Sequence, residues 1–413
     1  MTTRVAVVGG GPGGVMLAYL LARARISVTL LETHRDFDRD FRGDSLHPYT
    51  LELLDSLGLA EDLLRLDHVA ARYFRFHTPT GTVTTADYGK VRSPFPYVAL
   101  MPQARFLAFL AERASRFDDF ELRTDAKVVD LLTARSEDHQ ATERWPADRR
   151  VRGVRYRSAD GEHDLAADLV IAADGRFSRL RRIADLPVRS LGATTDLLWF
   201  RLPRQPDDPP EADTDLYFGS GNYVGLLGAP TSWQVGYSLP KGGYRALRAD
   251  GVQPIKDFLH RHVGWLGDRI ELLENFNQTT LLSVDISRVD RWHRPGLLLI
   301  GDAAHVISPV GGNGILMAIQ DAVAAANRLI PAMRTGQLDS ADLVAIQAAR
   351  EPAIRQVQAQ QVRVERRAAT ARQAGRPLIP TRPLKVITAI PGMRARAATA
   401  NAYGPYPPRL EVG

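Results

Sequence analysis

The chain has 413 residues, of which 45% are hydrophobic and 24% charged, and its 53 Lys and Arg exceed its 47 Asp and Glu. This length suits two domains and a tail, and no apolar run approaches the ~18 residues that a membrane-spanning helix needs. The lack of cysteine excludes disulfides and thiolate metal sites, and we expect no metal centre. Because residues 1–5 enter a strand-like run without a secretion signal, we expect a cytoplasmic chain.

The net charge of +6 raises the hypothesis of a nucleic-acid partner. Much of the excess, however, is arginine in what reads as one late helix, at Arg350, Arg355, Arg363, Arg366, Arg367, Arg372 and Arg376. No zinc-finger spacing, ribonucleoprotein-type string or basic ribbon interleaved with aromatics accompanies it. We therefore expect a solvated helix face and no nucleic-acid partner, and scattered arginine can also attract anionic cofactor phosphates or an acidic substrate.

A glycine-rich turn lies between the first predicted strand, residues 4–8, and a helix-like segment at 15–24, and a second strand follows at 28–31. The turn satisfies G-x-G-x-x-G in the strand-to-helix context in which that motif binds a dinucleotide pyrophosphate. Glu32 closes the second strand, where a carboxylate can accept both hydroxyls of an adenosine ribose. The motif predicts a site of FAD or NAD type formed by Gly9, Gly11, Pro12, Gly13, Gly14 and Glu32.

A second glycine-rich stretch occurs at residues 297–322. An apolar run at 297–300 suits a buried strand, and Gly301 and Asp302 break it where a tight turn would meet a helix. Pro309 and the glycines at 311, 312 and 314 then leave backbone N–H groups uncovered before an apolar-periodic helix. Such a turn suits a bulky polar cofactor.

The rest of the chain alternates between two kinds of pattern. Residues 48–66 and 102–117 read as helices, whereas 73–83 read as strands around a Thr-Pro-Thr-Gly turn, and 134–150 are polar and patternless. Between 197 and 282 strands dominate, which predicts a second, mainly antiparallel domain. Residues 340–375 read as a helix, and the Pro-rich segment after it is expected to be irregular.

Three strings together resemble the fingerprints of the group A flavoprotein monooxygenases, the para-hydroxybenzoate-hydroxylase-like family. They are the segment from Gly9 to Glu32, the string D-L-V-I-A-A-D-G-R-F-S-R-L-R at 168–181, and the Gly301-Asp302 pair. The resemblance implies an α/β fold with a glutathione-reductase-type Rossmann FAD domain, an inserted antiparallel β substrate domain and a C-terminal helix. The implied boundaries are 1–71, 102–188 and 291–335 for the FAD domain, 72–101 and 189–290 for the substrate domain, and 336–413 for the C-terminal segment and tail.

The same resemblance implies roles for individual residues. Asp302 would bind the ribityl chain, residues 311–314 would face the flavin ring edge, and Asp174 would lie near the pyrophosphate. Arg42 is similar to an arginine that reaches the FAD phosphates, and Gln103 to a glutamine at the ribityl region. The implied cofactor contacts are Arg42, Gln103, Asp174, Asp302, Gly311, Gly312, Asn313 and Gly314, with Pro309 assigned to catalysis. Where many relatives have asparagine this chain has Leu316, whose side chain cannot donate a hydrogen bond.

The resemblance further implies a monooxygenase that uses NADH or NADPH and O2 to hydroxylate or epoxidise a small aromatic or polyketide-like compound through a flavin C(4a)-hydroperoxide. Substrate contacts are expected from aromatic residues on alternating strand positions, Tyr217, Tyr223, Trp233 and Tyr237. We expect His305, in the turn itself, to be structural. Alternatives are a flavin oxidoreductase of the same fold that inserts no oxygen and a flavin-holding protein without enzymatic activity. The tryptophans form no Trp-x-Trp-x-Ile-Pro string, which disfavours a flavin halogenase.

Overall fold

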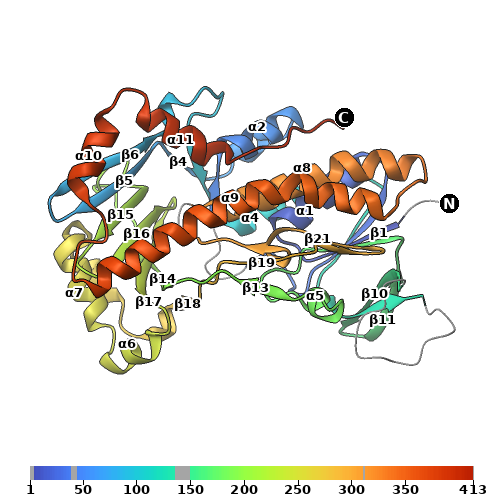
Figure 1. The fold of residues 1–413 in the computed structure, drawn as a ribbon, viewed down its shortest axis with the longest axis horizontal. Coiled ribbons are helices and arrows are strands. Elements are labelled where there is room, and N and C mark those ends of the chain that lie inside the picture. Colours follow the sequence, from blue (N-terminus) through green and yellow to red (C-terminus); the bar gives the residue numbers. More distant parts are fainter. Residues whose placement is uncertain (1–3, 39–43, 135–148, 310–311, 413) are drawn as a thin grey trace.

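The computed structural model describes residues 4–38, 44–134, 149–309 and 312–412. Two of the predicted cofactor contacts, Arg42 and Gly311, lie outside these residues. The described chain forms a mixed α/β fold in which a mainly parallel sheet and a mainly antiparallel sheet lie at opposite ends of the molecule (Figure 1). Within these ranges no helix combines the length and the apolar character that crossing a bilayer requires.

Six strands of the described chain form the first sheet, in the order β20-β21-β12-β1-β2-β8. They are β1 (Arg4–Val8), β2 (Ser27–Leu31), β8 (Phe120–Arg123), β12 (Leu169–Ala172), β20 (His293–Arg294) and β21 (Leu297–Leu299). All neighbours are parallel except β20 and β21. Parallel strands end at the same edge of a sheet, so the segments that follow β1, β2, β12 and β21 meet there. This edge therefore collects the glycine turn, Glu32, the 174–175 pair and the 301–302 pair.

Helices cover the parallel sheet and explain why its strands are apolar throughout. α1 (Pro12–Arg23) returns the chain from β1 to β2 and packs against α4 (Gln103–Ala114) and α8 (Asn313–Arg334). Strands that are buried on both faces need continuous apolar runs, and the side chains of β12 and β21 are all buried. The hairpin of β9 (Lys127–Thr133) and β10 (Val151–Ser158), extended by β11 (Gly161–Ala166), packs against β12.

The second large sheet of the described chain has seven strands, in the order β18-β14-β17-β16-β15-β5-β6. They are β5 (Tyr73–Thr78), β6 (Gly81–Asp87), β14 (Thr195–Pro203), β15 (Thr214–Phe218), β16 (Tyr223–Gly228), β17 (Ser232–Pro240) and β18 (Thr280–Leu282). Only β15 and β5 are parallel. One face packs on α6 (Tyr244–Asp250), α7 (Gln253–His262) and the 3-10 helix η2 (Gly264–Leu272), which leaves the other face for the site described below.

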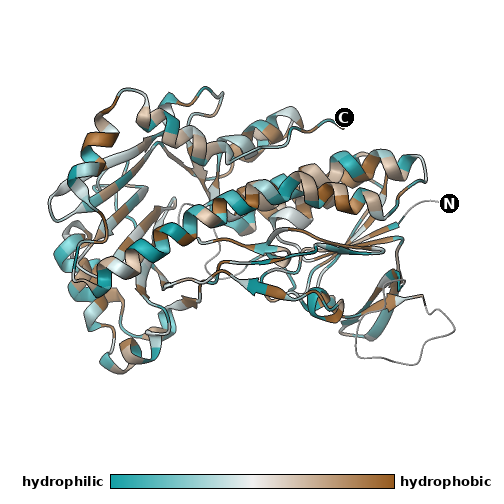
Figure 2. Ribbon diagram, viewed as in Figure 1, coloured by the Kyte–Doolittle hydropathy of each residue, from teal (hydrophilic) through white to brown (hydrophobic). Residues whose placement is uncertain are grey.

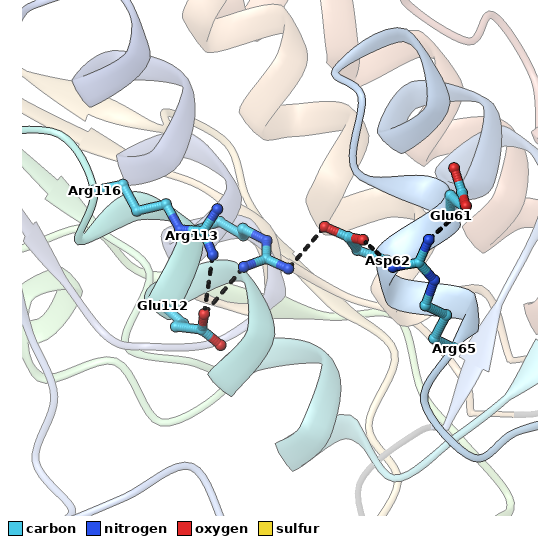
Figure 3. A network of polar contacts seen from close by, with 6 residues as sticks. All are labelled: Glu61, Asp62, Arg65, Glu112, Arg113 and Arg116. Atoms are coloured by element: carbon cyan, nitrogen blue, oxygen red, sulfur yellow. Dashed lines mark hydrogen bonds and ion pairs between the residues drawn. The ribbon is translucent and has the colours of Figure 1, made fainter.

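Shorter elements connect the two sheets. Two small sheets consist of β3 (Ser45–Leu46), β7 (Val98–Leu100) and β4 (Val69–Ala71), and of β13 (Val188–Ser190), β19 (Ser287–Val289) and β22 (His305–Val306). The remaining short helices are α2 (Pro48–Ser56), α3 (Ala60–Leu64), α5 (Arg179–Ile183), η1 (Tyr88–Lys90), η3 (Phe276–Gln278) and η4 (Gly301–Ala303). α3 is held to α4 by a polar network, in which Arg113 donates to Asp62 at 2.9 Å. Figure 3 shows this network, formed by Glu61, Asp62, Arg65, Glu112, Arg113 and Arg116.

The long helix α9 (Ser340–Gln373) runs across the molecule from one sheet to the other (Figure 1). At 1.5 Å per residue its 34 residues span about 51 Å. Gln358 donates to the Ser287 carbonyl at 2.8 Å, Glu365 accepts from the Thr194 backbone at 2.9 Å, and Arg372 donates to the Gly221 carbonyl at 3.0 Å. Hydrophilic and hydrophobic residues alternate along it (Figure 2), as expected for a helix with one solvated face.

The segment after α9 corrects one sequence-based expectation. Residues 376–412 are not irregular throughout, because they contain α10 (Thr381–Ala389) and α11 (Met393–Tyr403). Pro383 lies in the first turn of α10, where a missing N–H breaks no helical hydrogen bond. The tail beyond α11 lies on earlier helices: Tyr49 donates to the Pro408 carbonyl and Asn327 to the Arg409 carbonyl, both at 2.7 Å. α10 and α11 lie beside β6.

Candidate active site

The first glycine turn leaves the N-terminus of α1 open. A Cβ on Gly9 would lie 2.4 Å from the Ala173 carbonyl oxygen, and one on Gly14 would lie 2.1 Å from the Gly9 carbonyl oxygen, so both positions need glycine for packing. A Cβ on Gly11 would meet nothing within 4 Å. No side chain caps α1, its first turn has no acidic residue, and Pro12 occupies the first position without cost. The bare N–H groups and the helix dipole thus form an anion-binding cradle beside Gly11.

Glu32 lies buried beside this cradle. Its Oε2 accepts a hydrogen bond from the Gly10 backbone N–H at 2.7 Å, and its Oε1 accepts from the His34 N–H at 3.0 Å. These contacts fix the carboxylate at the carboxyl end of β2, next to the glycine turn. The geometry matches the position from which an acid can bind ribose hydroxyls.

Asp174, whose place near the pyrophosphate stays a prediction, has a side chain held by the residues that follow it. Its Oδ1 accepts from Ser178 Oγ at 2.5 Å, and its Oδ2 accepts from the Arg179 and Leu180 N–H groups at 2.8 and 3.2 Å. Burial raises the pKa of this carboxyl, and these hydrogen bonds oppose that rise. The side chain therefore caps α5, and it is the backbone of residues 173–174 that closely approaches Gly9.

A buried polar cluster holds the second glycine turn. Asp321 of α8 is fully buried, and its Oδ2 accepts from the Gly301 N–H at 2.9 Å and lies 2.6 Å from His305 Nε2. Arg350 of α9 is 1% exposed and donates through Nε to Asp321 Oδ1 at 2.9 Å. Burial raises the pKa of Asp321, but His305 and Arg350 reverse this and lower it below its ordinary value. Asp302, on η4, is thus presented by a turn that two other helices anchor.

This cluster shows that one arginine of the predicted solvated helix face is buried. It agrees with the expectation that His305 is a structural residue. Arg350 is not part of a solvated face, since a charge that deep inside a protein persists only with a partner. His305 belongs to the same structural cluster. No local pattern signals this arrangement, because Asp321 and Arg350 lie 29 positions apart on different helices. Because Arg350 fits the same helical spacing as the other arginines, the sequence pattern did not distinguish this buried residue from the exposed ones.

The turn before α8 is also open on one side. Gly312 has φ +68° and begins α8 as its N-cap, and its N–H donates to the Pro309 carbonyl at 3.0 Å. A Cβ on Gly314 would meet nothing within 4 Å, and the buried Asn313 Oδ1 has no hydrogen-bond partner among the described residues. Leu316 is fully buried in the core, so the residue that replaces the family's asparagine does not reach the open side. A flat polar group could therefore contact backbone at 312–314.

Gln103 begins α4 and contacts Asp44, the residue that directly precedes β3. The Gln103 N–H donates to Asp44 Oδ1 at 3.2 Å, and Asp44 Oδ2 accepts from Gln234 of β17. Burial raises the pKa of Asp44 to about 7, against the opposing hydrogen bonds and the charge of Arg201. Asp44, Arg201 and Gln234 all line a broad open depression beside Phe37, whereas Gln234 also lines the cavity described next. The Asp44–Gln234 contact thus separates two spaces.

The main cavity lies between the seven-stranded sheet and the turn that contains Pro309 and Gly312. Its empty volume is about 960 Å³ when the open solvent at its mouth is included. Its lining is mostly apolar and includes Phe74, Val98, Leu197, Trp199, Leu216, Leu226, Leu227 and Leu282. Polar side chains enter it from Ser45, His47, Thr214 and Gln234.

A row of four residues across neighbouring strands shapes the floor of the cavity. Trp199, Gly236, Gly225 and Leu216 are paired in register on β14, β17, β16 and β15. A Cβ on Gly236 would lie 2.9 Å from the Trp199 ring, and one on Gly225 would lie 3.1 Å from Leu216 Cδ2. The two glycines therefore allow the Trp199 ring to lie over Gly236 and the Leu216 side chain to lie over Gly225.

Of the four aromatic residues predicted to contact substrate, only Tyr223 lines the cavity. Trp233, Tyr237 and Tyr217 belong to the core on the opposite face of the sheet, where Trp233 donates to Asp208 at 2.6 Å. Strand residues alternate between faces, and on β17 it is Gln234 and Gly236 that point to the cavity. The geometry thus separates these three residues from the site, contrary to our expectation.

The described site combines an open helix N-terminus and a buried carboxylate, which are features of a dinucleotide-binding protein, with a mostly apolar cavity. The family model described as FAD binding domain matches residues 2–361, so the chain belongs to this family. It is 35% identical over 353 residues to 6-methylpretetramide 4-monooxygenase from Streptomyces rimosus, covering 85% of this chain and 80% of that protein. It is also 27% identical over 334 residues, 77% of this chain, to rifampicin monooxygenase from Streptomyces venezuelae, of whose length it spans 62%.

Among solved structures, a variant of PqsL from P. aeruginosa matches with a TM-score of 0.75 at 23% identity, covering 90% of this chain and 98% of that one. This likeness establishes the fold. Together with the family and the 35% identical relative, it shows that the chain is an FAD-dependent monooxygenase of the aromatic monooxygenase family.

Proposed function

We propose that the enzyme uses NADH or NADPH and O2 to hydroxylate or epoxidise an aromatic or polyketide-like compound held in the main cavity. The observation that carries this proposal is the apolar cavity that opens onto Pro309 and Gly312. The Trp199 ring, which lies over Gly236, gives this cavity an aromatic surface that suits a flat ring system. The relative at 35% identity is named for 6-methylpretetramide, which makes that compound the first probe.

We infer that the first sheet and its helices form a glutathione-reductase-type Rossmann FAD domain from residues 1–71, 102–188 and 291–335. Residues 72–101 and 189–290 would form the substrate domain, and 336–413 the C-terminal segment. The N–H groups beside Gly11 favour a pyrophosphate, Glu32 favours ribose hydroxyls, and Asp302 favours ribityl hydroxyls. Gly312 to Gly314 offer backbone N–H groups to a ring edge. The open space at Gly11 and Gly314 supports this placement.

Bound FAD would supply the electron transfer and the activation of oxygen, and the protein's own contribution is binding and enclosure. Leu197, Leu227 and Trp199 keep water from the reacting ring. Pro309 fixes the wall of the cavity nearest the predicted ring edge. Within the described lining no paired carboxylates converge as general acid and base, since the only acid, Asp215, is held by Arg75 at 2.9 Å and His77 at 2.7 Å.

The test is to mix the purified holoenzyme with 6-methylpretetramide and to follow NADH and NADPH oxidation in ¹⁸O₂. We expect the compound to accelerate oxidation of one or both nucleotides and the product to gain one ¹⁸O atom. If nucleotide oxidation yields peroxide in equal amount with every compound of an aromatic panel, and no oxygenated product forms, the proposal is wrong. The enzyme would then match the alternative of an oxidoreductase without oxygen insertion.

A further inference from the structure

Helix α10 presents an apolar stripe to solvent, which we call the outer stripe: Pro383, Val386, Ile387 and Ile390. Their spacing of i, i+3, i+4 and i+7 is the pattern by which a surface helix normally packs on the core. Here the same pattern faces outward, since Val386 is 68%, Ile387 47% and Ile390 51% exposed. Contiguous exposed apolar side chains of this kind mark a surface that meets a partner or a membrane.

The opposite face of α10 holds the helix on the protein. Thr381 and Thr388 are buried, and Thr381 Oγ1 lies 2.9 Å from Thr78 Oγ1. Lys385 Nζ donates to the Thr80 carbonyl at 3.1 Å. The helix is therefore attached through its more polar face to the turn between β5 and β6, and this attachment directs the outer stripe away from the core.

The charge around the outer stripe is of one sign. Residues 366–410 contain nine Lys and Arg and no Asp or Glu, and Arg382 is exposed beside Pro383. Residues 78–86, next to α10, have no acid, and the acid that ends β6, Asp87, is buried and accepts from Arg72 at 3.1 Å. Two copies that met symmetrically through this face would bring the same positive surface together. The expected occupant is therefore anionic.

The size of the outer stripe separates a lipid surface from an acidic protein. Four side chains on one nine-residue helix fall short of the roughly 20–30 residues that each side of a stable protein interface contributes. Apolar side chains flanked by basic ones on a single helix are instead the arrangement that lies in the headgroup layer of an anionic bilayer. α10 lies at the outer edge of the molecule beside β6, where a flat surface can reach it (Figure 1).

We propose that α10 docks the enzyme on an anionic lipid surface. The outer stripe enters the headgroup layer, and the surrounding arginines lie against lipid phosphates. This docking is peripheral and involves no membrane-spanning helix. It is independent of the proposed function, because its test needs neither a substrate nor turnover.

The experiment floats the purified holoenzyme with vesicles of phosphatidylcholine alone or of equal parts phosphatidylcholine and phosphatidylglycerol. We expect binding to the anionic vesicles to be about tenfold or more tighter, and to weaken when NaCl is raised from about 0.1 to 1 M, which shortens the screening length from about 10 to 3 Å. Ile387→Gln with Ile390→Gln should weaken it about tenfold or more. Arg382→Gln should weaken it about fivefold on anionic vesicles only.

Val344→Gln is the matched control, because Val344 is an equally exposed valine near the start of α9 and should leave vesicle binding unchanged. All variants should keep the thermal melting of wild type, since the replaced side chains are exposed.

Equal binding to both kinds of vesicle, or wild-type binding by the Ile387→Gln, Ile390→Gln variant, would overturn the proposal. So would a failure to bind anionic vesicles. In that case, saturable binding of poly-L-glutamate would indicate an acidic protein as the partner, and a dimer in light scattering that Ile390→Gln dissociates would indicate a second copy of the chain.

Discussion

Arg350 Nε lies 2.9 Å from Asp321 Oδ1, although the two residues come from different helices and both side chains are almost wholly removed from solvent. The second oxygen of Asp321 holds the Gly301 N–H at 2.9 Å. A single buried ion pair thus links α9, α8 and the turn that presents Asp302.

Removing one member of this pair should be costly. Arg350→Met leaves the Asp321 charge buried with only His305 beside it, and we expect a loss of about 3–5 kcal/mol in the free energy of unfolding. Arg355→Met is the control on the same helix, because Arg355 is exposed and pairs with Glu351 at 2.7 Å, a contact worth about 0–1 kcal/mol. Urea denaturation followed by circular dichroism measures both. Equal stability of the two variants would mean that the buried pair does not support the fold.

Two glycines of the first turn should respond differently to alanine. Gly11→Ala places a methyl group in open space at an ordinary φ of −79°, so the fold should be retained while FAD affinity falls by about 10–100-fold. Gly14→Ala places a methyl group against the Gly9 carbonyl and should cost about 1–3 kcal/mol of stability or more. Thermal unfolding and the FAD content after dialysis separate the two effects. A Gly11→Ala protein that keeps full FAD affinity would refute the pyrophosphate assignment.

Asp302 provides a second probe of the cofactor site. Asp302→Ala removes a carboxylate that should bind ribityl hydroxyls, and we expect FAD to bind about tenfold or more weakly. Asp290→Ala is the control, since Asp290 is an exposed acid one residue beyond β19. Quenching of flavin fluorescence on titration of the apoprotein gives both dissociation constants. Identical constants for the two variants would remove Asp302 from the site.

Two tryptophans test which face of the second sheet contacts substrate. Trp199→Phe widens the cavity above Gly236, so KM and the ratio of oxygenated product to NAD(P)H consumed should change while stability changes little. Trp233→Phe removes one of the hydrogen bonds to the Asp208 carboxylate and leaves a gap in the core, so it should cost about 1–3 kcal/mol of stability with KM unchanged. Steady-state kinetics and thermal melting decide between them. The reverse pattern would restore Trp233 as a substrate contact.

Asp44 should make stability depend on pH. Its pKa is raised to about 7 in the folded protein, so the folded state holds a proton that the unfolded state releases near pH 4. Stability is therefore lost as the pH rises from about 4 through 7, by up to about 4 kcal/mol. Asp44→Asn keeps an acceptor for the Gln103 N–H and can donate to the Gln234 amide oxygen once that amide turns over, without a charge. Its stability relative to wild type should therefore rise between pH 5 and pH 8. The exposed Asp268→Asn should show a constant difference, and a constant difference for Asp44→Asn too would contradict the prediction.

Sequence patterns predicted the features that depend on residues close together in the sequence. The strand, glycines and helix at residues 4–24 form one local unit, and Glu32 follows its partner strand directly. The mixed fold and the family followed from three such units in the correct order. Contacts across the fold were not predictable in the same way, as Asp321 with Arg350 and Asp44 with Gln234 illustrate.

The sequence also did not reveal which face of the sheet each strand residue occupies. Trp233 and Gln234 are adjacent in sequence, and only the pairing of β17 with β14 and β16 decides which of them points to the cavity. His47 carried no signal of its own, because it joins the cavity wall only after the segment between β3 and α2 has met Pro309 and Gly312 in the folded chain. Arg42 and Gly311 stay predictions, since both lie outside the described residues.

The depth of the cavity depends on the absence of side chains at Gly225 and Gly236, which are paired on neighbouring strands. Because both lie inside regular, fully paired strands, a methyl group at either position would leave the hydrogen bonds of the sheet in place but would force the Trp199 ring or Leu216 to move. Small changes in the coding sequence could thus retune the ring size accepted by members of this lineage, step by step, while the machinery at the other sheet stays intact. Divergence in substrate choice would then need no new loops.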